Sequence, residues 1–212
     1  MNDPRHAAER RPRTGRHEVT EYPPGHLRRP PLPNRPPSKA APEVRSKAVS
    51  DAQRVGRAVS SAAAGALITR GNGEVLLVHH ARARTWVLPG GKAEWGEPPA
   101  ATCAREVSEE LGVPATVGRL LVYNWMTTRA ELFPGAAASE HAYPCHVFTF
   151  HATLAPEAQE RIRTPERELL GWRWWDLEEA CVPGVMEPYN ARNLRAAHTA
   201  WREDRGAAYL ES

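Results

Sequence analysis

The segment from Gly90 to Val113 constrains the fold of this chain more than any other. The run TWVLPGG (85–91) predicts a short apolar strand that enters a glycine turn, because paired glycines let the backbone turn tightly. Residues 98–111 follow with helical character, since two prolines suit the first turn of a helix and Gly112 suits a left-handed end. The segment therefore predicts a strand, a tight turn and a short helix in close succession.

Three glutamates share one face of this predicted helix. Glu106, Glu109 and Glu110 stand at i, i+3 and i+4, so their carboxylates lie close together and repel one another. A hard divalent cation would compensate, because Mg²⁺ prefers oxygen ligands and binds carboxylates together with water and substrate phosphates. The other interpretation of these residues alone is a solvated acidic helix end after an ordinary glycine turn.

The spacing around these glutamates resembles the Nudix box, G-x5-E-x7-R-E-U-x-E-E-x-G-U, in which U is a bulky aliphatic residue. Every fixed position is matched, from Gly91 through Glu97 to the run REVSEELGV (105–113). The lead-in WVLPGGKAEWGE is similar to the usual one, and WRWWDLEE (172–179) resembles the strand and helix start that close many such domains. Asp176 is predicted to cap the short helix that begins there. The resemblance covers roughly residues 60–205, and residues 1–57 lie outside it.

The resemblance to the Nudix family implies a fold, an activity and a set of site residues. The implied fold is an α/β/α sandwich around a mixed β-sheet, and the implied reaction is hydrolysis of a nucleoside diphosphate linked to another group. The implied cofactor is Mg²⁺, with Mn²⁺ as a substitute, held by Glu106, Glu109, Glu110 and the Gly90 carbonyl. Arg105 and Glu97 match the pair that orients the loop and helix of the box.

A general base is expected outside the box, as in many members of the family. Glu168, six residues before Trp174, is the first candidate, Glu166 is the second and Glu140 is the third. The alternative for each is a surface charge beside a strand.

Arginines and aromatic residues are the candidate substrate contacts. Arg82 and Arg84 precede the glycine turn and could hold a terminal phosphate, or they are solvated loop charges. Trp125, Phe133 and Trp172 could stack on a nucleobase, since an aromatic face suits that contact, or they pack in the core or at its rim.

The first 57 residues differ in composition from the rest. They hold 10 of the 20 prolines and 13 Lys/Arg against 6 Asp/Glu, a net charge of +7, which leaves −4 for residues 58–212 of a chain whose net charge is +3. Dense proline and few apolar groups predict a disordered basic tail ahead of the domain at 58–212. Its run RRPPLPNRPP (28–37) could bind an anionic partner or an aromatic groove of the SH3 or WW kind.

Cysteine spacing and the length of apolar stretches predict the environment of the chain. The widely spaced cysteines predict neither a disulfide framework nor a zinc site, so a reducing cytoplasm is expected. No stretch approaches the roughly 18 consecutive apolar residues of a membrane span.

Several functions stay open from the residues alone. The first alternative to hydrolysis is a Nudix-fold protein that senses a nucleotide without cleaving it, and the second is an interaction protein whose working part is the tail. RNA decapping ranks low, because no aromatic and basic platform for RNA is evident, and nucleic acid is not an expected partner. A small nucleotide diphosphate is the expected substrate, and a homodimer is implied only by the resemblance. Nucleoside triphosphates, ADP-ribose-like sugars, dinucleoside polyphosphates and capped RNA all remain candidates.

Overall fold

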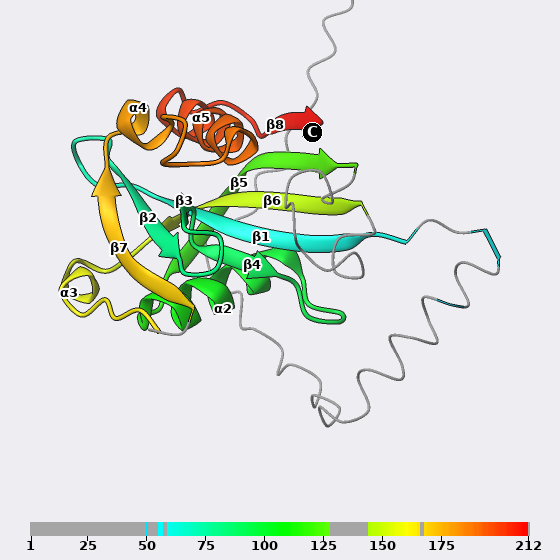
Figure 1. The fold of residues 1–212 in the computed structure, drawn as a ribbon, viewed down its shortest axis with the longest axis horizontal. Helices are drawn as coiled ribbons and strands as arrows, with labels where there is room; N and C mark the ends of the chain where they lie inside the picture. The colour runs from blue at the N-terminus through cyan, green and yellow to red at the C-terminus, as the bar shows by residue number, and fades with distance from the viewer. Residues whose placement is uncertain (1–49, 51–54, 57–58, 128–143, 166–167, 212) are drawn as a thin grey trace, which may run out of the picture. The chain divides into compact units, whose positions relative to one another are not determined.

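The computed structural model describes residues 50, 55–56, 59–127, 144–165 and 168–211, so the predicted tail lies almost entirely outside the described residues. The larger sheet has five strands in the order β4-β1-β6-β5-β8 (Figure 1). β1 runs parallel to β6 and β8 runs parallel to β5, whereas the other two pairs are antiparallel. The sheet is therefore mixed, as predicted, and its strands are β1 (Ser61–Ile68), β4 (Gly90–Lys92), β5 (Thr116–Met126), β6 (Cys145–Thr153) and β8 (Ala208–Glu211).

A second, antiparallel sheet has the order β3-β2-β7, with β2 (Val75–His80), β3 (Thr85–Val87) and β7 (Leu169–Trp175). The strand predicted at the start of 85–91 is confirmed as β3. The glycine turn predicted after it is wrong, because the chain leaves this sheet after β3 and the glycine pair joins the larger sheet in β4. Pro89 has no N–H to donate to a ladder, and its carbonyl instead accepts from Ala66 N–H at 2.8 Å. The interruption brings the glycine pair onto the edge strand of the larger sheet.

Two long helices, α2 (Pro99–Leu111) and α5 (Pro188–Arg202), begin with proline at a position where no N–H is needed. The first follows the predicted helix closely and ends at Gly112, whose φ of 68° is left-handed and whose N–H donates to Ser108 O at 3.0 Å. Two short helices also form, α3 (Pro156–Gln159) and α4 (Leu177–Ala180). The predicted cap of the latter is confirmed, since the Asp176 carboxylate accepts the N–H groups of Glu178 and Glu179. Neither α3 nor β8 was predicted.

The core lies on both faces of β1. Ala64 and Ala66 belong to the buried cluster that α2 supplies through Cys103, Val107 and Leu111. Leu67, directly after Ala66, belongs to the cluster that α5 supplies through Leu194, Ala197 and Ala200. Successive strand residues point to opposite faces, so the two helices cover opposite sides of the sheet. The α/β/α sandwich implied by the sequence is confirmed.

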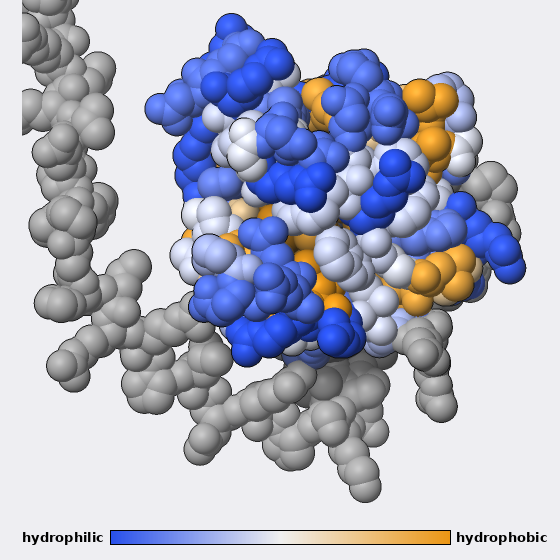
Figure 2. Space-filling model, turned by 90° about the vertical axis from the view of Figure 1, so that its left-hand side faces the viewer, coloured by the Kyte–Doolittle hydropathy of each residue, from blue (hydrophilic) through white to orange (hydrophobic). Residues whose placement is uncertain are grey.

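The face of the domain beside β7 is mostly hydrophilic (Figure 2), as expected when apolar side chains are buried between these layers. Figure 2 shows the side on which β7, α3 and α4 lie, where hydrophilic residues cover most of the area and hydrophobic ones show in separate patches. Within the described ranges, no helix is long and apolar enough to cross a membrane.

Candidate active site

The glycine pair on β4 lets the helix and the strand approach each other. Gly90 has φ +153°, and a Cβ there would lie 2.4 Å from the Ala64 carbonyl oxygen of β1. A Cβ on Gly91 would lie 2.6 Å from Glu106 Cδ. Such distances are too short for real Cβ contacts, so only glycine allows β4 to pair here while a glutamate of α2 lies against the strand.

Arg105 joins the acidic side chains of this region. Its Nε and Nη2 donate to the two oxygens of Glu97 at 2.9 and 3.0 Å, a bidentate pair. Its Nη1 lies 2.9 Å from Glu106 Oε1 and 2.8 Å from Glu109 Oε2. The hydrogen bond from Arg105 is the main reason that the pKa of Glu97 falls to about 2. The pairing of Arg105 with Glu97 that was considered from the sequence is thus present in the structure.

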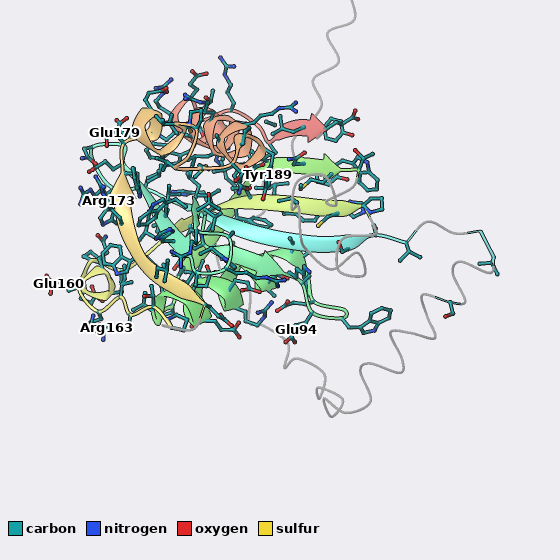
Figure 3. All side chains as sticks on the ribbon, in the orientation of Figure 1. Glu94, Glu160, Arg163, Arg173, Glu179 and Tyr189 are labelled. Carbon is teal, nitrogen blue, oxygen red and sulfur yellow. The ribbon has the colours of Figure 1, made fainter. Side chains whose placement is uncertain are left out.

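Glu97 also holds the turn that leads from β4 to α2. One of its oxygens accepts the N–H of Glu94 at 2.9 Å, in the turn where Figure 3 labels that residue. The same oxygen accepts the hydroxyl of Thr102 at 2.9 Å, and Arg105 Nη2 donates to the Lys92 carbonyl at 3.0 Å. Sequence reasoning missed Thr102 and the Lys92 carbonyl, because neither occupies a fixed position of the box. Together these bonds fix the loop against the helix.

Glu110 is the most buried of the three glutamates, with 8% of its surface exposed. Its carboxylate accepts the N–H of Gly90 at 2.8 Å. Burial is the main reason that the pKa of Glu110 rises to about 8, and the charges of Glu106, Glu168 and Glu109 raise it further. Burial also raises the pKa of Glu106, although Arg105 opposes that shift. These carboxylates therefore sit where a negative charge is costly without a cation.

The donor set fits a hard divalent cation in its chemistry. The available ligands are carboxylate oxygens on one helix face, two of them with a raised pKa, beside the backbone of a glycine pair. Among the residues that the structure describes, no group of three or more His, Cys, Asp or Glu side chains is already arranged to hold a metal ion. Instead, Glu106 and Glu109 share the Arg105 guanidinium and Glu110 accepts from Gly90, so the charge of the acidic face is offset in part.

Glu168, the predicted base, lies near this face, and the turn that carries the predicted phosphate contacts is joined to the backbone of Glu168. Glu168 is exposed, directly precedes β7, and is near enough to Glu110 for its charge to raise the pKa of that carboxyl. Arg82 and Arg84 are exposed in the turn between β2 and β3, where Arg84 has φ 52°. This turn is tied to the start of β7, because Ala81 N–H donates to the Glu168 carbonyl at 2.9 Å. Glu140 and Glu166 lie outside the described residues.

Two of the aromatic candidates lie on strands, one on β5 and one on β7. Trp125 is on β5, separated from β4 by β1 and β6, and it packs edge-on against His146 with ring centroids 4.7 Å apart. Trp172 is on β7 and packs against the cluster on the α2 side. The strand order separates Trp125 from the strand beside the glutamates, and Phe133 lies outside the described residues.

Comparison with known proteins agrees with this arrangement. A family model described as the NUDIX domain matches residues 59–197. The CTP pyrophosphohydrolase of Escherichia coli (strain K12) is 31% identical over 140 residues, which covers 64% of this chain and 94% of that protein. Diphosphoinositol polyphosphate phosphohydrolase 2 of Rattus norvegicus is 51% identical over 49 residues, which is 23% of this chain and 27% of that protein. Among solved structures, a UDP-X diphosphatase superimposes with a TM-score of 0.54 at 20% identity, covering 78% of this chain and 74% of that one, which shows a shared fold.

The chain therefore belongs to the Nudix family. It is a hydrolase of phosphoric anhydride bonds, of the kind that acts on nucleoside diphosphate-linked substrates.

Proposed function

We propose that this Nudix hydrolase cleaves a diphosphate linkage in nucleoside triphosphates and depends on Mg²⁺, for which Mn²⁺ can substitute. The observation that carries the proposal is the carboxylate face of α2, which is packed on the glycine pair of β4. The choice of triphosphates follows the Escherichia coli relative, whose name gives CTP as its substrate and 94% of whose length is matched. ADP-ribose-like compounds and dinucleoside polyphosphates are the competing substrate classes.

In this proposal, Glu106, Glu109 and Glu110 hold the cation through carboxylate oxygens and Gly90 through its carbonyl. When bound, the ion would neutralise phosphate charge and lower the pKa of a coordinated water. Arg105 and Glu97 are positioning residues, because their bidentate pair fixes the helix relative to the loop. Much of the catalysis of phosphoryl transfer comes from positioning and charge neutralisation, which such a frame supplies.

Glu168 is the proposed general base. It would accept a proton from the attacking water as the bridging P–O bond breaks, which yields a nucleoside monophosphate and pyrophosphate. Its support is its electrostatic contact with Glu110 and its exposure at the start of β7. Arg82 and Arg84 are the proposed contacts to the terminal phosphate, supported by the bond that joins their turn to the backbone of Glu168.

The test is a screen of the full chain against nucleoside triphosphates, ADP-ribose and dinucleoside polyphosphates with Mg²⁺ or Mn²⁺, in which both products are identified. Glu109→Gln and Glu110→Gln should each lower kcat at least about 100-fold, since each removes a charged ligand. Glu168→Gln should lower kcat by about 100-fold and remove the acidic limb of its pH profile. Glu179→Gln, on the exposed surface of α4, is the matched control and should retain full activity. Undiminished turnover in both helix variants would refute the metal role.

We also propose a cytoplasmic location, supported by Cys103, Cys145 and Cys181, which are all unpaired thiols. A homodimer and an anionic or SH3/WW-like partner for residues 1–57 are proposals of the same kind. Sedimentation of the full chain, and partner recovery with and without those residues, would test them.

A further inference from the structure

A hollow on the outer side of α5 is separate from the carboxylate face of α2. Its volume is about 390 Å³, and small-ligand sites hold roughly 300–1,000 Å³. Arg192 and Arg195 at this hollow are exposed, whereas Asn193 of the same helix is buried and donates to Thr149 of β6. The hollow therefore faces away from the larger sheet. We name it the α4–α5 hollow, and its lining residues are Cys181, Pro183, Met186, Pro188, Ala191, Arg192 and Arg195.

The wall of the α4–α5 hollow is mostly apolar and is held in place. The Cys181 thiol donates to the carbonyl of the buried Ala191 at 3.8 Å, which joins the end of α4 to α5. The loop between these helices is also joined to β3, because the Val185 carbonyl accepts the N–H of Trp86 at 3.0 Å and the hydroxyl of Thr85 at 3.1 Å. The hollow thus has a wall that is already formed, as is usual for small-ligand sites.

Two guanidinium groups form the charged rim of the α4–α5 hollow. Arg192 and Arg195 are three positions apart, so they lie on the same side of the helix. Arg195 pairs with the Glu178 carboxylate, whereas Arg192 donates to the neutral Glu211 carbonyl at 2.7 Å. A guanidinium has five N–H donors, so each group can still donate to an anion after such a bond. Because Glu178 offsets one of the two cations, the rim carries a net charge of about +1.

The thiol of Cys181 shows that this charge acts on the apolar wall. Burial is the main reason that the pKa of Cys181 is raised, Arg195 opposes the rise, and Glu178 adds to it. Of the seven described residues that line the hollow, none is acidic. An apolar wall below two cations fits a molecule that has one negative charge and a short apolar body.

We propose that the α4–α5 hollow binds a small monocarboxylate through Arg192 and Arg195. The carboxylate lies between the two guanidinium groups, which match its two oxygens in geometry. The apolar body of the ligand lies on Met186, Pro188 and the Cys181 thiol. This site does not depend on the proposed catalytic function.

Calorimetric titration of the full chain with octanoate tests the charge and the apolar body separately. Octanoate should bind saturably with one molecule per chain, and octylammonium should not bind, because its charge has the wrong sign. Acetate, which has the carboxylate without the chain, should bind at least about tenfold more weakly. The double variant Arg192→Gln/Arg195→Gln should lower the affinity for octanoate at least about tenfold, since both charge-assisted contacts are lost. Arg202→Gln, at the other end of α5, is the matched control and should bind octanoate as the wild type does.

Alkylation of Cys181 gives a second readout, which locates the ligand. Cys181 is half-buried, whereas Cys103 and Cys145 are buried, so N-ethylmaleimide should label Cys181 first. Octanoate at about ten times its Kd should slow this labelling by about tenfold, because few sites stay empty. Labelling of the two buried thiols, followed by peptide mass spectrometry, should not change.

Three results would overturn the proposal. The first is the absence of saturable octanoate binding. The second is equal affinity for octanoate in the wild-type protein and the double arginine variant, which would show that the alkyl chain adheres without recognition of its charge. The third is saturable binding that leaves the labelling rate of Cys181 unchanged, which would place the ligand elsewhere on the chain.

Discussion

The two long helices cover opposite sides of one sheet but contribute in different ways. α2 carries its charged side chains within one short segment, and they contact a strand that lies just before them in the chain. α5 is rich in alanine, and the buried side-chain amide of Asn193 donates a hydrogen bond to Thr149, which lies 44 positions away in the chain. The side chains proposed for catalysis thus lie close together in the chain, whereas the contacts of α5 depend on the order of the strands.

Substitution of two neighbouring glycines is expected to have the largest effect, because one borders the backbone of β1 and the other borders a glutamate of α2. In Gly90→Ala the new Cβ meets the Ala64 backbone, which cannot move aside. The free energy of unfolding should therefore fall by roughly 2–4 kcal/mol. In Gly91→Ala the new Cβ meets the Glu106 carboxylate, the flexible end of a side chain. That variant should keep most of its stability and lose about 100-fold in kcat/KM, because a displaced carboxylate is enough to do so.

Thermal unfolding and kinetics on the same samples separate the two effects. Gly71→Ala is the control, since a Cβ there has no neighbour within 4 Å. Equal losses of stability in the two variants would show that a Cβ at Gly91 is no easier to accommodate than one at Gly90. The Glu106 carboxylate would then be unable to move aside.

The ionisation of Glu97 makes the stability of the fold depend on pH. The pKa of Glu97 is about 2 in the folded protein, against an ordinary 4.5. Because the folded value is the lower one, the ionised form stabilises the fold above about pH 4.5, and that stability is lost as the pH falls toward 2. Glu97→Gln should cost about 1–3 kcal/mol at neutral pH and flatten the stability profile between those two values. Glu160→Gln, whose side chain Figure 3 shows at the surface, should keep the wild-type slope.

The smallest effect is expected beside α5. Asp176→Ala removes the side-chain cap of α4 and should lower stability by about 1 kcal/mol with no change in turnover. Glu187 occupies the same cap position before α5 without a side-chain bond, so Glu187→Ala should change neither. A loss of activity in the Asp176 variant would show that this end of the domain is coupled to the catalytic face.

Sequence reasoning reached the parts of the fold that depend on local chemistry. The helix at α2, its glycine end, the pairing of Arg105 with Glu97 and the Asp176 cap all follow from residues close together in the chain. The sandwich architecture followed from the resemblance to the Nudix family.

The parts that were missed depend on contacts between distant segments. The break between β3 and β4 was not anticipated, because apolar residues continue through Leu88 while the change of sheet is decided by Pro89 and by pairing with β1. β8 was missed because four residues give little pattern without a partner strand. The burial of Asn193 on α5 could not be predicted from the sequence, because an asparagine in a helix becomes buried only when the helix packs against the sheet.

The guanidinium of Arg105 acts as a resident counter-ion for the helix that bears the glutamates. One guanidinium offsets only part of the charge of Glu97, Glu106 and Glu109, and the pKa of the buried Glu110 stays raised. Under the proposed Mg²⁺ dependence, a chelator should abolish activity while the pair of Arg105 and Glu97 keeps the loop joined to the helix.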